Sequence, residues 1–158
     1  MNGFRMLKIA FAALLAIVPA CGDDDPVSPA TSFTAALTGA NEVPPVTTTA
    51  TGNATLAVVG SQLTYTVNVA NLSNALVAHI HVAAAGANGP VRLNLCGTGA
   101  PEPGCTSGTG VLVAGTNGTA LGITFDSLLS AMRTGGAYVN VHTSANQGGE
   151  IRGQVVAN

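Results

Sequence analysis

The stretch GNATLAVVGSQLTYTVNVA, residues 52–70, decides the fold class of this chain. In its second half apolar and polar residues alternate, which places one set of side chains on a single strand face: Leu63, Tyr65, Val67 and Val69. Gly60-Ser61 separates the two halves, and a pair that begins with glycine suits the two-residue turn of a β-hairpin. The stretch therefore predicts an antiparallel hairpin.

Short apolar runs separated by Gly, Asn and Pro continue from Phe33 to the end of the chain. They predict further strands over residues 75–83, 91–96, 110–114, 119–125, 137–143 and 150–156. Asn117-Gly118 lies between two of these runs and predicts a second tight hairpin. One short helix is expected over 126–133, with Asp126 as its N-cap and Gly135 at its end. The pattern predicts one all-β domain over residues 33–158, an antiparallel β-sandwich or a barrel, and we favour the β-sandwich.

Charge is scarce in this chain. Charged residues make up 8% and apolar residues 47%, against about 25% charged residues in an average soluble domain. The chain is therefore expected to fold, because disordered chains combine high charge with few apolar residues. Its Lys and Arg residues are few: Arg5, Lys8, Arg92, Arg133 and Arg152. The basic patch of a nucleic-acid binder is missing, and no lysine beyond residue 20 exists for a phosphate loop or a Schiff base.

The first twenty residues have the pattern of a secretory signal peptide. Arg5 and Lys8 precede an apolar run over residues 9–20 that is too short to span a bilayer. The alternative interpretation of this run is a buried N-terminal helix. Val-Pro-Ala-Cys then resembles a bacterial lipobox, which predicts a lipid on Cys21. Residues 21–32 would form a flexible tether, and the mature protein would be extracytoplasmic and anchored at a membrane surface.

The two remaining cysteines, Cys96 and Cys105, enclose a short loop rich in Gly and Pro. In an oxidising compartment they are expected to form a disulfide, which stabilises the fold by about 2–3 kcal/mol in the chain-entropy model. The alternative is a reactive or metal-binding thiol pair. That alternative lacks the CxxC spacing and a neighbouring histidine.

A third predicted hairpin, at the C-terminal end, gathers most of the polar groups of this half of the chain. Its turn at 144–148 sets a register in which His142 lies opposite Glu150, and Asn140 lies opposite Arg152. Such pairs could hydrogen-bond only to hold the two strands in register, or they could form a functional site. The sequence leaves both interpretations open.

Four motifs occur in order along the chain: GANEVPPV at 39–46, AHIH at 78–81, YVNVHT at 138–143 and GEIRGQ at 149–154. Together they resemble the CHRD domain, a module of the developmental antagonist chordin that also occurs singly in many bacterial secreted proteins. The resemblance covers residues 33–156. It implies an extracytoplasmic β-sandwich module, immunoglobulin-like or superoxide-dismutase-like, more than it implies an activity.

The three histidines of the chain, His79, His81 and His142, all lie within these motifs. Two residues apart in a strand, His79 and His81 point to the same face. With His142 beside them they would form a three-nitrogen site suited to copper or zinc. Glu150 could orient His142 or bind the metal itself, and Arg152 would add positive charge nearby. The HxH strand is similar to a ligand strand of copper–zinc superoxide dismutase, although this chain has too few histidines for a bridged two-metal site.

Glu42 and Asn140 complete the set of candidate binding residues. Glu42 precedes a rigid Val43-Pro44-Pro45 segment and could supply a carboxylate to the histidine face or accept backbone hydrogen bonds. Two hypotheses of function follow. The first is a non-enzymatic extracytoplasmic binding module with an unidentified protein or ligand partner. The alternative is a copper- or zinc-binding protein in which the metal could support redox chemistry.

Overall fold

A computed structural model describes residues 29–158 of the chain. The elements in that range are β1 (Ser32–Thr38), η1 (Gly39–Asn41), β2 (Thr51–Val59), β3 (Gln62–Leu72), β4 (Ala75–Val82), β5 (Val91–Cys96), β6 (Gly108–Asn117), α1 (Phe125–Arg133), β7 (Ala137–Thr143), β8 (Ile151–Gln154) and β9 (Val156–Ala157). The expected signal peptide, Cys21 and most of the tether lie outside the described residues. Within them, no helix is long and apolar enough to cross a membrane.

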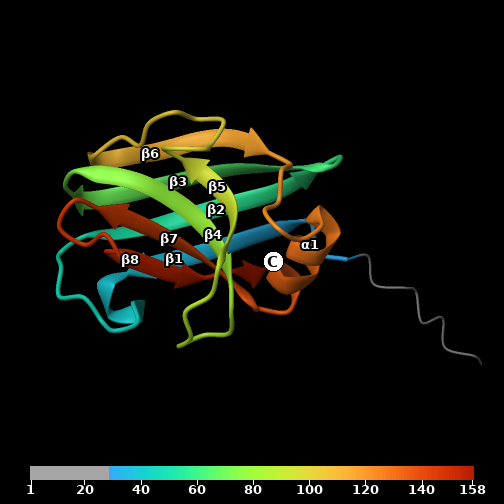
Figure 1. The fold of residues 1–158 in the computed structure, drawn as a ribbon, viewed down its shortest axis with the longest axis horizontal. Helices are drawn as coiled ribbons and strands as arrows, with labels where there is room; N and C mark the ends of the chain where they lie inside the picture. Colours follow the sequence, from blue (N-terminus) through green and yellow to red (C-terminus); the bar gives the residue numbers. More distant parts are fainter. Residues whose placement is uncertain (1–28) are drawn as a thin grey trace, which may run out of the picture.

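The strands form one antiparallel sheet that curls into a nearly closed, sandwich-like shape. Its order is β5-β4-β7-β8-β1-β2-β3-β6, with β9 paired to β1. In Figure 1, β4, β7 and β8 cross in front of β1, β2 and β3, and the apolar core lies between these halves. A hydrogen bond links the two end strands of the sheet, β6 and β5: Asn117 Nδ2 donates to the Asn94 carbonyl at 2.9 Å. The predicted all-β fold with one short helix is confirmed.

The hairpin of β2 and β3 forms as the alternation predicts. Val59 pairs with Gln62 across the turn, and Gly60 has a φ of 61°, a conformation that glycine adopts without strain. The predicted inward residues are buried: Leu63, Tyr65, Val67 and Val69. Residue periodicity therefore determines which face of this strand meets the core.

The prediction of a second tight hairpin at Asn117-Gly118 is wrong. Strand β6 ends at Asn117, and no strand follows over residues 119–125. The side chain of Asn117 is used elsewhere: it bonds to the Asn94 carbonyl and accepts from the Thr119 N–H at 2.8 Å. Instead of turning back on itself, β6 pairs along its length with β3. The last predicted strand is also interrupted, at Val155, between β8 and β9.

Helix α1 begins one residue earlier than predicted. Its N-cap is Thr124, whose hydroxyl accepts from the Ser127 N–H at 3.1 Å, so Asp126 lies in the first turn. The predicted end at Gly135 is confirmed, with a φ of 70°. There the Gly136 N–H donates to the Ala131 carbonyl at 2.7 Å, a bond typical of a helix that ends in glycine.

The predicted disulfide between Cys96 and Cys105 is present, with a Cα–Cα distance of 5.4 Å. It closes the loop between β5 and β6 at the open side of the sheet. The Gly97 N–H also donates to the Glu102 carbonyl at 3.0 Å inside this loop. The disulfide excludes the alternative of a free thiol pair.

Candidate metal centre

Strand β7 is buried on both faces, although only one of them meets the apolar core. Val139 and Val141 point inward and are fully buried. The outward side chains are polar and buried as well: Tyr138, Asn140 and His142. We call the outward side of β4, β7 and β8 the polar face. Loops make hydrogen bonds over it and shield it from solvent: residues 39–50, 83–90 and 144–150.

The pairing of β7 with β8 follows the register predicted from the turn. Asn140 lies opposite Arg152. The paired residues end at Val141 and Ile151. The Glu150 N–H donates to the Val141 carbonyl at 2.8 Å, one residue out of this register, so the predicted pairing of His142 with Glu150 does not form. Cross-strand pairing therefore places Asn140 and Arg152 on one face, as expected, but it does not extend to Glu150.

The three histidines meet on β4 and β7. His79 pairs with Asn140 and His81 pairs with Tyr138, and His142 lies two residues further along β7. One ring nitrogen from each histidine lies within 4.8 Å of the other two. His79 Nδ1 and His142 Nε2 are 3.3 Å apart. The fold thus brings together the three rings that the sequence nominates.

Backbone carbonyls fix two of these rings. His81 Nδ1 lies 2.9 Å from the Gly89 carbonyl oxygen, and His142 Nδ1 lies 2.9 Å from that of Gln147. A carbonyl can only accept, so Nδ1 carries the proton in both neutral rings and Nε2 keeps its lone pair. His81 Nε2 is buried and has no hydrogen-bond partner among residues 29–158. Metal-binding histidines typically have one nitrogen free and the other held in this way.

Burial keeps the three rings uncharged. Burial, together with the neighbouring His142 and His81, lowers the pKa of His79 to about 4. Burial also lowers the pKa of His81 and that of His142, although the hydrogen bonds to Gly89 and Gln147 oppose the shift. All three imidazoles are therefore neutral at pH 7, which is the form that binds metal ions.

Glu150 faces hydroxyl and amide groups and makes no hydrogen bond to His142 within the described range. Its Oε1 accepts from the Thr48 hydroxyl at 2.8 Å, and its Oε2 accepts from the Thr143 hydroxyl at 2.6 Å and from Asn146 Nδ2 at 3.3 Å. Burial acts to raise the pKa of Glu150, but these hydrogen bonds outweigh it and lower the pKa. Glu150 therefore fixes the turn, and the Gln147 carbonyl holds His142.

Glu42 lies beside Asn140 on the polar face, close to Gly149. Burial raises the pKa of the Glu42 carboxyl to about 7, against the attraction of Arg152 and a hydrogen bond with Asn140. Glu42 Oε1 and Asn140 Oδ1 are both buried without a partner in the described part of the chain. Both atoms lie within 2.7 Å of the point that a Cβ on Gly149 would occupy. This corner therefore has room only for glycine and favours a protonated Glu42.

Arg152 and His81 flank the ring of Tyr138. The His81 ring stacks on Tyr138 with centroids 4.8 Å apart and planes 9° apart. The Arg152 guanidinium lies 3.4 Å from the Tyr138 centroid. Its nitrogens donate to the Ala87 carbonyl and to Asn88 Oδ1 at 2.7 and 3.1 Å. Arg152 thus contacts the surroundings of the histidines.

Sequence reasoning missed two residues that shape the site, Gly89 and Gln147. Both act through backbone carbonyls, which the pattern of side chains does not reveal. For Gly89 a structural signal exists, because a Cβ there would lie 2.1 Å from the Val82 carbonyl oxygen. The contact to His81 therefore requires glycine at this position.

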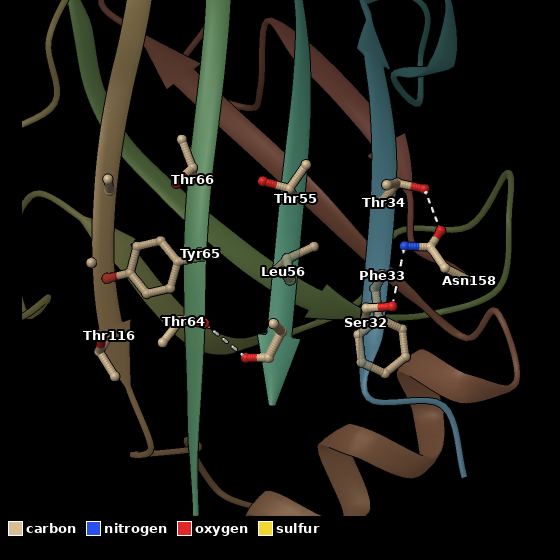
Figure 2. Close-up of a pocket in the computed structure, with 13 residues that line it drawn as sticks. Ser32, Phe33, Thr34, Thr55, Leu56, Thr64, Tyr65, Thr66, Thr116 and Asn158 are labelled. Carbon is tan, nitrogen blue, oxygen red and sulfur yellow. Dashed lines mark hydrogen bonds between the residues drawn. The ribbon is translucent and has the colours of Figure 1, made fainter. Parts of the chain in front are cut away.

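A shallow pocket of about 630 Å³ lies away from the polar face, on the outer side of β1, β2, β3 and β6. Figure 2 shows that threonine side chains line much of it, among them Thr34, Thr55 and Thr66. Tyr65 also borders it, but its hydroxyl donates into the core, to the Leu95 carbonyl at 2.8 Å. No histidine or carboxylate side chain lines this pocket, so the titratable groups that could perform chemistry are concentrated on the polar face.

An antiparallel sheet that covers its polar face with loops and holds three histidines there defines a small β-sandwich module. The family model of the CHRD domain matches residues 33–155, and the chain belongs to this family. This membership supports a role as a binding module. Comparison with curated proteins and with solved structures finds no match.

Proposed function

We propose that this CHRD domain is a non-enzymatic binding module whose ligand is a transition-metal ion, copper or zinc, held by His79, His81 and His142. One observation carries the proposal: a nitrogen of each ring lies within 4.8 Å of the other two. Two of the rings are oriented by carbonyls so that Nε2 keeps its lone pair. Cross-strand pairing alone does not require that three imidazoles converge.

The donor set suits these metals. Imidazole binds copper and zinc well, and zinc–nitrogen bonds of about 2.0–2.1 Å place tetrahedral ligand atoms about 3.3 Å apart. His79 Nδ1 and His142 Nε2 are already 3.3 Å apart. His81 Nε2 is buried without a partner among the described residues, and a metal would supply the partner it lacks. Three protein ligands leave a fourth position for water or another donor.

Metal titration tests this proposal directly. Metal-free protein is titrated with Cu(II) and with Zn(II) at neutral pH, and His79→Ala, His81→Ala and His142→Ala are titrated beside it. We expect one ion per chain, with affinity lowered at least about 100-fold by each change, because two imidazoles bind far more weakly than three. Glu102→Gln, which removes a carboxylate away from the polar face, is the matched control. Binding that is no tighter than that of one surface histidine, or that survives all three changes, refutes the proposal.

We also propose that the domain acts outside the cytoplasm, held at a membrane surface by a lipid on Cys21. The Cys96–Cys105 disulfide supports an oxidising compartment. Mass spectrometry of the mature protein and its partitioning into detergent provide the test, with Cys21→Ser as the comparison. A mature chain that retains Met1, or a Cys21→Ser variant that remains with the membrane, refutes this location.

A further inference from the structure

Residues 83–90, which we call the strap, connect β4 to β5 and reach the polar face; they are the yellow-green loop below β4 in Figure 1. The Gly89 carbonyl meets His81 Nδ1 at 2.9 Å, and the Gly89 N–H donates to the Tyr138 hydroxyl at 3.1 Å. The strap therefore makes the contact that orients the His81 ring. Anything that fixes the strap also fixes the free nitrogen of His81.

Arg152 holds the strap from β8. Its side chain is only 2% exposed. Nη2 donates to the Ala87 carbonyl at 2.7 Å and Nη1 donates to Asn88 Oδ1 at 3.1 Å, just before Gly89 in the sequence. The guanidinium also lies against the face of Tyr138. Two routes thus lead from Arg152 to His81, one through the strap and one through the stacked Tyr138 ring.

We propose that Arg152 is a positioning residue of the metal centre. It holds the strap and Tyr138 so that His81 keeps its proton on Nδ1 and presents Nε2 to the metal. Within residues 29–158 Arg152 makes no hydrogen bond to a histidine, so it acts through Gly89 and Tyr138. Its part in metal binding rests on the proposed function above, whereas its effect on the His81 ring does not require a metal.

The guanidinium suits this role in two ways that an ammonium group does not share. Its planar fork donates to two acceptors at once, here the Ala87 carbonyl and Asn88 Oδ1. Its flat face stacks on an aromatic ring while both hydrogen bonds are made. Arg152→Lys is therefore expected to keep the charge and lose most of the geometry, and Arg152→Met is expected to lose both.

A long-range proton–nitrogen spectrum of metal-free protein with labelled histidine rings tests the inference at neutral pH. In the wild-type protein we expect His81 and His142 to carry their proton on Nδ1. In Arg152→Met the His81 ring becomes a mixture of both tautomers, with Arg152→Lys between, while His142 is unchanged because the Gln147 carbonyl holds it. A general loosening of the fold would change both rings. An unchanged His81 ring in Arg152→Met overturns the proposal.

Arg92→Met is the matched control, because Arg92 donates to the Leu121 carbonyl at 2.9 Å, away from the polar face. It should leave all ring spectra unchanged. If Arg152→Met does not fold, Asn88→Ala tests the same route from the exposed side of the strap. That change removes the acceptor of Arg152 Nη1 and a 2.8 Å bond to the Val43 carbonyl. A His81 tautomer that does not respond to Asn88→Ala also contradicts the inference.

Metal titration of the same variants separates this inference from the proposed function. Loss of the outer contacts of a metal-binding histidine typically lowers affinity about 10- to 100-fold, and we expect this for Arg152→Met. If the wild-type protein binds no metal, the proposed function fails, and the tautomer result alone decides whether Arg152 orients His81. If the wild-type protein binds metal and Arg152→Met binds it equally tightly, only the positioning role is overturned.

Discussion

The two faces of β4 and β7 differ in chemistry, yet most side chains of β7 and the central residues of β4 are buried or half-buried on both. The inward side chains are apolar and pack directly into the core: Ala78, Ile80, Val139 and Val141. The outward side chains are polar, and most are buried because loops bond to them. Apolar groups need only a fitting shape, whereas a buried polar group costs stability unless a partner is placed beside it. The inward face therefore contributes stability, and the outward face depends on specific geometry.

Ile80→Ala should have the largest effect on stability. Ile80 is fully buried and lies between His79 and His81 in the sequence. Removing its side chain leaves a cavity and should cost about 2–5 kcal/mol in the free energy of unfolding. His79→Ala, on the opposite face, should cost about 1 kcal/mol but abolish metal binding. Urea unfolding and metal titration of both variants make the comparison, and equal losses of stability would contradict the division between the faces.

Metal should stabilise the protein through the polar face alone. A ligand that binds only the folded state at 100 times its dissociation constant adds about 2.7 kcal/mol. We expect this gain for copper or zinc in the wild-type protein and none in His81→Ala, measured as the free energy of unfolding with and without metal. Ile80→Ala should show the same gain as wild type, because the inward cavity leaves the ligands in place. A gain that persists in His81→Ala would assign the metal to another site.

The fold class was predictable because its signal is local. Alternation over Gln62–Leu72 and the Gly60-Ser61 turn determine one hairpin without reference to the rest of the chain. The Asn117-Gly118 prediction failed because tertiary contacts override a turn preference: Asn117 bonds to β5 while β6 pairs with β3. A rule based on neighbouring residues does not include a competing hydrogen-bond partner that lies far away in the sequence.

The site was partly predictable for the same reason. The turn after β7 sets the register that places Asn140 opposite Arg152. That β4 lies beside β7, and so brings His79 near His142, depends on the order of the whole sheet. The strap and the Gln147 carbonyl contact the histidines through backbone atoms, so no pattern of side chains predicts these contacts. The residue types identify the three histidines as candidate ligands, and only the fold shows which groups orient them.

The same Thr→Val substitution should cost more stability on the loop-covered polar face than on an exposed face of the sheet. Thr143 is fully buried, and its hydroxyl donates to Glu150 at 2.6 Å. Thr143→Val should cost about 1.5–3 kcal/mol, because it removes a hydrogen bond to a charged group. Thr55 lies exposed on the outer face of β2 (Figure 2), and Thr55→Val should change stability by no more than about 0.5 kcal/mol. Similar losses of unfolding free energy for the two variants, measured by urea unfolding, would show that a hydroxyl covered by the loops contributes no more than an exposed one.

Glu42 places an ionisable carboxyl on the polar face. Burial raises the pKa of Glu42 from 4.5 to about 7, so the folded protein holds a proton that the unfolded chain releases. Its contribution to stability is therefore fully present below pH 4.5 and is lost as the pH rises through 7. The histidines act in the opposite direction, because their lowered pKa values favour the neutral form and make the folded state less stable as the pH falls below 6.5.

Glu42→Gln isolates the carboxyl from the histidines, because the histidine contributions cancel when variant and wild type are compared at one pH. Glutamine keeps the shape of the protonated acid and cannot ionise. We expect near-equal unfolding free energies at pH 4.5, and a variant more stable by about 1–2 kcal/mol at pH 8, where wild type buries a charged carboxylate. Urea unfolding at several pH values measures the difference, and a difference that does not change with pH would mean that the pKa of Glu42 is the same in the folded and the unfolded protein.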